Sequence, residues 1–173
     1  MNTENKKPPH ISFRQFIEKF PEVELPVMLS EETAHIFSRE NNPLPSLMVE
    51  QFMLTPEERD SLDEMTEFVP CFRVPETYDF YAVVYWRGGL MDHRYVMLTF
   101  TKDGRPIDRR VLAGMYSDGQ SIVQSVAHIE DDWTIYVVSG KQKVSDKMGR
   151  EASKNTAREL ELLPEGQIVD VSD

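Results

Sequence analysis

The residues best suited to acid–base chemistry lie near the end of an expected strand. His128 and Glu130 are two positions apart, so an extended chain turns both side chains to one face, and Asp132 follows closely. An imidazole beside a carboxylate can act as a general base or hold a metal ion. Acids at this point also suit a turn between strands. We therefore keep an enzyme, hydrolase-like and with a pocket at the sheet near His128 and Glu130, as the alternative prediction.

The single cysteine, Cys71, is a second candidate. A nucleophilic thiol needs a lowered pKa and a nearby base, and Arg73 lies two positions further along. Free cysteines are, however, among the most commonly buried residues. We therefore predict that Cys71 is an inert core residue. One cysteine also excludes an internal disulfide framework and a zinc site built from several thiolates.

Motifs of the common nucleotide-binding and hydrolytic enzymes are absent from the sequence. It has no Walker-type loop, no G-x-G-x-x-G, no G-x-S-x-G and no H-E-x-x-H. The histidines, His10, His35, His93 and His128, form no His-x-His or His-x₃-His pair. These patterns predict no cofactor and no metal site, and they favour a protein without catalytic activity.

Charge is concentrated in one stretch of the chain. The whole sequence carries a net charge of -11, and residues 30–67 hold ten acids against Arg39 and Arg59, a balance of -8. An excess of acid argues against general binding of DNA or RNA, since neutralising phosphates requires a basic face. Residues 141–158 carry the opposite charge, but they contain no aromatic residue on which a base could stack.

The acidic stretch contains a strong helix start at Thr55-Pro56, with an N-cap residue followed by proline. A helix over 56–66 would turn Leu62, Met65 and the following Phe68 toward the sheet and its acids toward solvent. The candidate partner-binding residues are these acids: Glu57, Glu58, Asp60, Asp63 and Glu64. Solvated helix faces usually mix both signs of charge, but this face would carry almost only acids. We therefore predict that it binds a basic protein partner. A merely acidic surface is the simpler interpretation.

The elements that must position these residues change in kind along the chain. Helix patterns dominate residues 12–67, starting with Ser12 and Gln15 at the spacing of a capping box. Strand patterns and hairpin turns dominate residues 68–171, with Asp103-Gly104 the clearest tight turn. Helices followed by strands, without alternation, indicate an α+β fold: short N-terminal helices packed on an antiparallel β-meander of about six strands.

A chain of 173 residues with 40% apolar content suits a single domain. We expect a disordered leader over 1–10, one domain over 11–173 and a mobile loop over 141–158. No apolar run is long enough to span a bilayer, and the N-terminus lacks the apolar stretch of a signal peptide. These features predict a cytoplasmic protein that does not bind membranes.

Two segments carry a resemblance. Phe20-Pro-Glu-Val-Glu-Leu-Pro26 and Leu98-Thr-Phe-Thr-Lys-Asp-Gly-Arg-Pro-Ile-Asp108 resemble small uncharacterised α+β proteins of gut bacteria. In those proteins a Leu-Pro lead-in precedes a meander with a Phe-x-Lys-x-Gly-x-x-Ile-Asp hairpin. The resemblance implies a type of fold and no activity. Together the residues favour a non-catalytic, soluble binding or interaction protein with an acidic helical face.

Overall fold

The computed structural model describes residues 10–117, 119–143 and 154–172. Its helices are α1 (Phe13–Glu18), α2 (Glu31–Glu40), α3 (Ser46–Phe52) and α4 (Pro56–Ser61). Its strands are β1 (Val27–Leu29), β2 (Glu67–Arg73), β3 (Phe80–Gly88), β4 (His93–Thr101), β5 (Pro106–Ser117), β6 (Ser121–Ile129), β7 (Thr134–Lys143), β8 (Lys154–Leu162) and β9 (Ile168–Asp170). None of the described helices is long and apolar enough to cross a membrane.

Side-chain caps determine where most helices begin. Ser12 accepts a hydrogen bond from the Gln15 amide, and the Gln15 side chain accepts one from the Ser12 amide, which confirms the predicted capping box. Thr55 caps α4 in the same position, with Pro56 in the first turn. Ser30 and Thr33 form an equivalent box at the start of α2.

The sheet is larger than the predicted six strands. β2 to β9 pair antiparallel in chain order, and β1 pairs with β6, so the described residues form a sheet of nine strands. The antiparallel meander is therefore confirmed, and the strand count is corrected. Part of the difference arises because β1 lies within residues 12–67, which were predicted to be mainly helical, yet it pairs with β6 as an additional strand.

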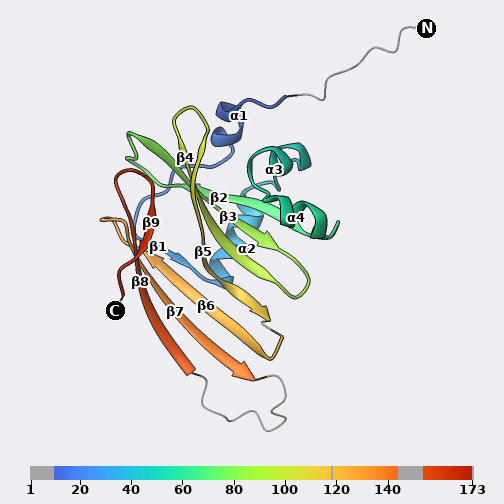
Figure 1. Ribbon diagram of the computed structural model, residues 1–173, viewed down its shortest axis with the longest axis vertical. Helices are drawn as coiled ribbons and strands as arrows, with labels where there is room; N and C mark the ends of the chain where they lie inside the picture. Colours follow the sequence, from blue (N-terminus) through green and yellow to red (C-terminus); the bar gives the residue numbers. More distant parts are fainter. Residues whose placement is uncertain (1–9, 118, 144–153, 173) are drawn as a thin grey trace, which may run out of the picture.

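The sheet folds back on itself at β5. β5 pairs with β4 along most of its length, as far as Met115, and Gly114 to Ser117 also pairs with the first half of β6. The second half of β6 pairs with β1. Gly114 allows this bend because its φ is +148°, and a Cβ there would lie 2.0 Å from the His93 carbonyl oxygen. The result is two layers, β2–β5 and β1 with β6–β9; in Figure 1, β6, β7 and β8 lie below β2, β3 and β4.

Polar contacts close the side of the fold where β9 meets β4 and β5. Thr99 Oγ1 donates to the Gly166 carbonyl at 2.7 Å. The Asp108 carboxylate accepts from the Ile168 amide at 2.8 Å, and Arg110 donates to the Ile168 carbonyl at 3.0 Å. The β8–β9 turn at 164–166 is thereby fixed against the opposite layer.

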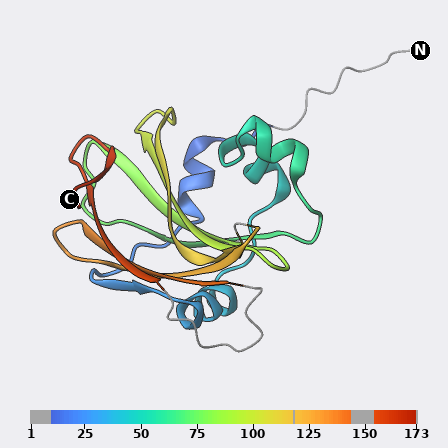
Figure 2. The ribbon, with the colours of Figure 1, turned by 60° about the horizontal axis from the view of Figure 1, so that its bottom comes forward.

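The molecule has two apolar cores. The inner core fills the space between the two layers and includes Phe72, Phe80, Met97, Leu112 and Ile135. The outer core lies on the other face of β2–β4, where α1 and α3 pack through Phe16, Phe20 and Met48. Figure 2 shows α1, α3 and α4 on one side of the sheet and β1 with α2 on the opposite side.

The position of α2 corrects the prediction that all helices pack on one face of the sheet. Ala34 and Phe37 of α2 pack into the inner core, beside β1 and β2, and the Phe37 and Phe72 rings lie 5.8 Å apart. Tyr95 in β4 holds the start of this helix, because its hydroxyl donates to the Ser30 carbonyl at 2.6 Å. α2 thus belongs to the inner core and α1 and α3 to the outer core, whereas α4 contributes no buried residue.

Both ends of the predicted loop over 141–158 are strand in the structure. β7 continues to Lys143 and β8 begins at Lys154, paired through Lys141 opposite Lys154 and Gly140 opposite Asn155. Strand pairing satisfies the backbone there although the side chains are polar, so apolar content was the wrong criterion. Residues 144–153 lie outside the described residues, as do residues 1–9 of the predicted leader.

The hairpin at Asp103-Gly104 is confirmed. Gly104 has a φ of +92°, and a Cβ at this position would lie 2.8 Å from Cγ of Phe13. The turn therefore requires glycine both for its backbone conformation and for its contact with α1.

Candidate partner-binding site

The five predicted acids do not share one helical face. α4 ends at Ser61 and Leu62 is extended, so the predicted helix over 56–66 is wrong in its second half. The Asp63 carboxylate accepts a hydrogen bond from the Met65 amide at 3.0 Å, a local turn that replaces a further helical turn. Glu57, Glu58 and Asp60 therefore lie on α4, whereas Asp63 and Glu64 lie in the connection to β2.

The exposure of Met65 and the exposure of Glu58 are each the opposite of what was predicted. Met65 was predicted to face the sheet, but it is 78% exposed. The Glu58 side chain was predicted to face solvent, but only 16% of it is exposed. Its Oε1 lies 2.8 Å from Nη2 of Arg109, and its Oε2 lies 3.7 Å from Nη1 of Arg87. Glu58 is therefore not available to a partner.

An ion pair takes the place of an apolar contact beneath α4. No residue of this helix is fully buried, and Glu58 joins it to Arg87 of β3 and Arg109 of β5. Tyr85 lies in the same region, and burial raises its pKa to about 12, an effect that Arg109 opposes and Glu58 reinforces. The sequence could not reveal this arrangement, because the three charged residues come from separate elements.

Two of the predicted acids, Asp63 and Glu64, lie at a hollow between α3 and the start of β2. Its volume is about 360 Å³. Its apolar floor consists of Leu44, Val49, Leu62 and Phe68. Its rim carries four exposed acids, Glu50, Asp63, Glu64 and Glu67, and we call this site the acidic hollow. Among the described residues these four acids form no ion pair.

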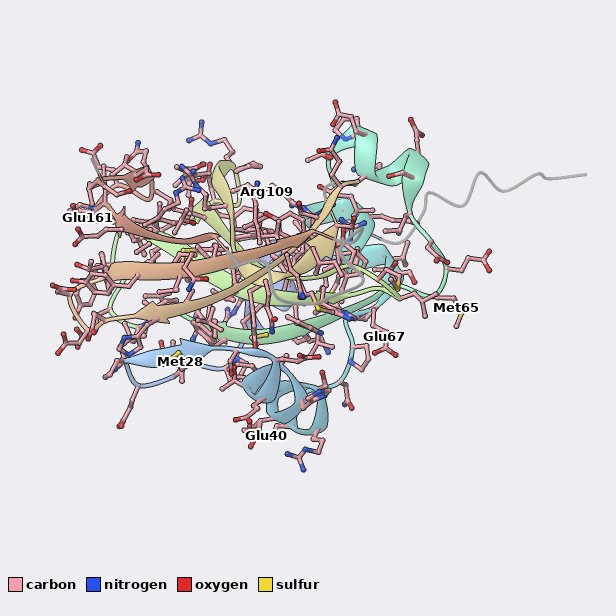
Figure 3. All side chains as sticks on the ribbon, turned by 90° about the horizontal axis from the view of Figure 1, so that it is seen from below. Met28, Glu40, Met65, Glu67, Arg109 and Glu161 are labelled. Atoms are coloured by element: carbon pink, nitrogen blue, oxygen red, sulfur yellow. The ribbon has the colours of Figure 1, made fainter. Side chains whose placement is uncertain are left out.

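Short backbone contacts define the shape of the acidic hollow. The Leu44 amide donates to the Phe68 carbonyl at 2.7 Å, which ties the segment before α3 to β2. The Thr66 amide donates to the Asp63 carbonyl at 3.0 Å, which holds the acidic turn at its edge. Figure 3 shows Glu67 and Met65 together at this side of the molecule, away from Glu40 of α2.

Of the five predicted residues, only Asp63 and Glu64 line the acidic hollow. Glu57 and Asp60 are exposed on α4, and the Glu58 side chain is largely covered between the helix and the sheet. Sequence reasoning missed Glu50 and Glu67. A signal was present for both, since each acid precedes or follows an apolar residue that is buried, Val49 next to Glu50 and Phe68 next to Glu67.

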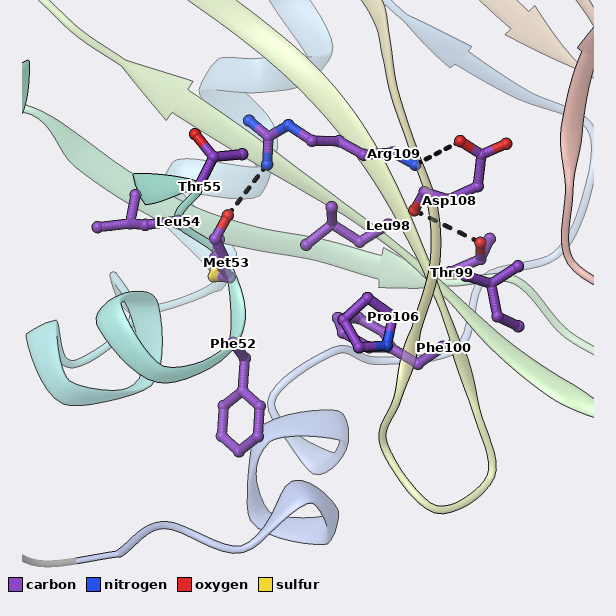
Figure 4. Close-up of a pocket in the computed structure, with 11 residues that line it drawn as sticks. Phe52, Met53, Leu54, Thr55, Leu98, Thr99, Phe100, Pro106, Asp108 and Arg109 are labelled. Atoms are coloured by element: carbon purple, nitrogen blue, oxygen red, sulfur yellow. Dashed lines mark hydrogen bonds between the residues drawn. The ribbon is translucent and has the colours of Figure 1, made fainter. Parts of the chain in front are cut away.

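A second hollow lies between the α3–α4 connection and the β4–β5 hairpin (Figure 4). Its volume is about 380 Å³ and its wall is largely apolar, with Phe52, Leu54 and Leu98. Its two charged residues are already engaged in the fold. Arg109 donates to the Met53 carbonyl at 3.0 Å and pairs with Glu58, and Asp108 accepts from two backbone amides. This hollow therefore offers shape and apolar surface without an available charge.

The alternative site is formed only in part. His128 Nδ1 lies 3.2 Å from Glu130 Oε1, so the two side chains do share a face of β6 as predicted. Each is 35% exposed, and they lie beside the register positions of Met28 and Tyr136 on the outer face of the sheet. Asp132 belongs instead to the turn, where accepting the Thr134 amide lowers the pKa of its carboxyl. In the described part of the chain no three His, Cys, Asp or Glu residues are grouped to hold a metal.

Cys71 occupies a structural position. It is 1% exposed, its thiol donates to the Val69 carbonyl at 3.7 Å, and burial raises the pKa of the thiol well above its usual value. A raised pKa lowers the fraction of thiolate, which is the reactive form. These features agree with the prediction of an inert core residue.

Comparisons with known proteins found no matching family model, no curated protein and no solved structure. The resemblance to small gut-bacterial proteins therefore stays a prediction.

Proposed function

We propose that this protein is a non-catalytic binding protein, and that its acidic hollow takes a lysine or arginine side chain from a basic partner protein. The observation that carries the proposal is the combination in one hollow of an apolar floor and a rim of four acids. The proposal keeps Asp63 and Glu64 from the predicted partner-binding set, adds Glu50 and Glu67, and gives Glu58 a structural role.

The chemistry of the acidic hollow matches a long basic side chain. Lysine and arginine have an apolar stem and a charged head, and they bury the stem while the head stays near the surface. Leu44, Val49 and Leu62 would contact the stem. Carboxylates of the rim would receive the head, arginine by paired hydrogen bonds and lysine as a point charge.

The electrostatic field of the whole molecule also favours a basic partner. A net charge of -11 attracts cationic surfaces and raises the rate of encounter with them. The same field opposes binding to nucleic acid, whose phosphates need cations. The proposed partner is a basic protein in the cytoplasm rather than a nucleic acid or a membrane surface.

The test is the affinity for a fluorescent oligolysine peptide and a fluorescent oligoarginine peptide at low and high salt. One variant neutralises the rim with Glu50→Gln, Asp63→Asn and Glu64→Gln. The control variant neutralises three exposed acids elsewhere, Glu24→Gln, Glu40→Gln and Glu165→Gln, so that both variants have the same net charge. We expect the rim variant to bind about tenfold more weakly and the control variant to change by less than about twofold.

A third variant tests the contribution of the apolar floor to binding without changing the charge. Leu62→Ser keeps every acid but makes the floor polar, so we expect weaker binding with an unchanged dependence on salt. Equal weakening in the rim and control variants would mean that only the overall field attracts the peptides, and it would contradict the proposal.

A further inference from the structure

The hollow between the α3–α4 connection and the β4–β5 hairpin adjoins the ion pair of Glu58 (Figure 4). Two residues that line it contact the same oxygen of this carboxylate. Arg109 Nη2 lies 2.8 Å from Glu58 Oε1, and Thr55 Oγ1 donates to that oxygen at 3.2 Å. The polar end of a largely apolar hollow is therefore occupied by a carboxylate of the protein itself.

The contacts of Glu58 leave two buried polar atoms unsatisfied within the described residues. Glu58 Oε2 accepts no hydrogen bond, and Arg87 Nη1 lies 3.7 Å from it, too far for one. The Tyr85 hydroxyl is completely buried near Arg109, yet it forms no hydrogen bond of ordinary geometry. Buried polar groups are almost always paired in native structures. Two guanidinium groups and a hydroxyl therefore face one carboxylate that uses only part of their capacity.

The other charged residue that lines the hollow does not repel an anion from Arg109. Adjacent residues of a strand point to opposite faces, so Asp108 and Arg109 diverge. The Asp108 carboxylate accepts from the Ile168 amide at 2.8 Å, and Figure 4 shows the two charged groups extending in opposite directions. With Arg87 and Arg109 facing Glu58 alone, positive charge is in excess at the polar end of the hollow.

We propose that this hollow binds a small carboxylic acid with an apolar body, and that the Glu58 side chain is an internal substitute for the carboxylate of that ligand. The ligand carboxylate takes the place of Glu58 beside Arg109, where the Tyr85 hydroxyl provides a further donor. The apolar body lies against Phe52 and Leu98. The volume of about 380 Å³ and the apolar wall with few polar groups are typical of a small-molecule site.

The packing of α4 allows Glu58 to leave its position. No residue of this helix is fully buried, so few apolar contacts are lost when the side chain turns outward. Arg59 still ties the helix to α3, because it donates to the Glu50 carbonyl at 2.7 Å. The exchange replaces one carboxylate by another and returns Glu58 to water. The affinity for the ligand should therefore come mainly from burial of its apolar body.

The test is a titration of the full chain with acetate, butanoate and hexanoate, followed by amide chemical shifts. We expect the affinity to rise by about threefold for each added methylene group, with shifts centred on Phe52, Leu98 and Arg109. Hexanol has the same apolar chain without the negative charge, and it should bind at least about tenfold more weakly than hexanoate. Equal binding of hexanol and hexanoate would overturn the proposal, because the arginines would then have no part in binding.

Two variants with the same change of charge test the role of Glu58. Glu58→Gln removes the competing carboxylate, so we expect hexanoate to bind about tenfold more tightly, whereas Asp60→Asn, at an exposed position of the same helix, should change the affinity by less than about twofold. Hexanoate should also raise the melting temperature of Glu58→Gln more than that of Asp60→Asn, a readout that holds even if the first variant is less stable. An equal gain in both variants, or no shifts at the hollow in the parent and in Glu58→Gln, would overturn the proposal.

Discussion

Glu58 of α4 and Arg109 of β5 are 51 positions apart in the chain, yet Oε1 and Nη2 lie 2.8 Å from each other at the base of the helix. This pair is the main side-chain link between α4 and the sheet, because the helix has no fully buried residue. The acidic segment therefore has two functions: Glu58 holds the helix in place, and the rim of the acidic hollow faces outward.

Removal of Glu58 should destabilise the fold. Glu58→Ala leaves Arg109 and Arg87 without their carboxylate, and we expect the free energy of unfolding to fall by about 1–3 kcal/mol, less than for a fully buried pair because the site is partly exposed. Asp60→Ala on the same helix is the control, with an expected change below about 0.5 kcal/mol. Chemical denaturation measures both values. Similar losses in the two variants would contradict the role given to Glu58.

Gly114 should tolerate substitution far less well than Gly119. Both have positive φ, so alanine strains either backbone by about 1 kcal/mol. At Gly114 a Cβ would also lie 2.0 Å from the His93 carbonyl, whereas nothing lies within 4 Å of one at Gly119. We expect Gly114→Ala to cost about 3 kcal/mol or more in thermal or chemical unfolding, since the bend between the layers must open. Equal stability of the two variants would show that the bend does not depend on close packing.

Cys71 should resist thiol reagents in the folded protein. Its burial and its raised pKa both lower the concentration of accessible thiolate. We expect slow labelling under native conditions and rapid labelling in denaturant, followed by mass spectrometry over time. Rapid labelling of the native protein would show that Cys71 is accessible and would restore it as a candidate nucleophile.

Asp170 should titrate at unusually low pH. Hydrogen bonds from Ser172 and Arg158 lower the pKa of its carboxyl to about 2. A lowered folded-state pKa contributes stability above the unfolded-state value of about 4, and this contribution disappears as the pH falls toward 2. Carboxyl resonances followed by NMR between these pH values measure the midpoint directly. In Arg158→Gln the midpoint should move upward, and a midpoint that stays near 4 in the parent would contradict the contacts.

Local patterns predicted much of the fold. Ser12 with Gln15, Thr55 with Pro56, and Asp103 with Gly104 each specify a cap or turn through neighbouring residues, and all three are formed. The pairing of β1 with β6 and the bend at Gly114 depend on residues far apart in the chain, so periodicity alone could not reveal them. The extent of β7 and β8 was missed because strands there continue into polar sequence.

The sequence predicted which type of residue, acids, forms the candidate site, but not how these acids are arranged in the fold. The excess of acids over 30–67 indicated the region that contains the acidic hollow, and Asp63 and Glu64 line it. The hypothesis of a single helical face was wrong because Leu62 leaves the helix and the Asp63 carboxylate forms a turn. Glu58 was misplaced because its partners, Arg87 and Arg109, are contributed by the sheet.

Binding of a basic side chain in the acidic hollow is tested most directly by amide chemical shifts of isotope-labelled protein titrated with the oligoarginine peptide. We expect saturable shifts at the residues that form the hollow, centred on Leu44, Glu50, Leu62 and Glu67, that are lost in the rim variant and reduced by salt. Shifts spread equally over exposed acids elsewhere, such as Glu24 and Glu40, would contradict a specific site and leave only a general electrostatic attraction.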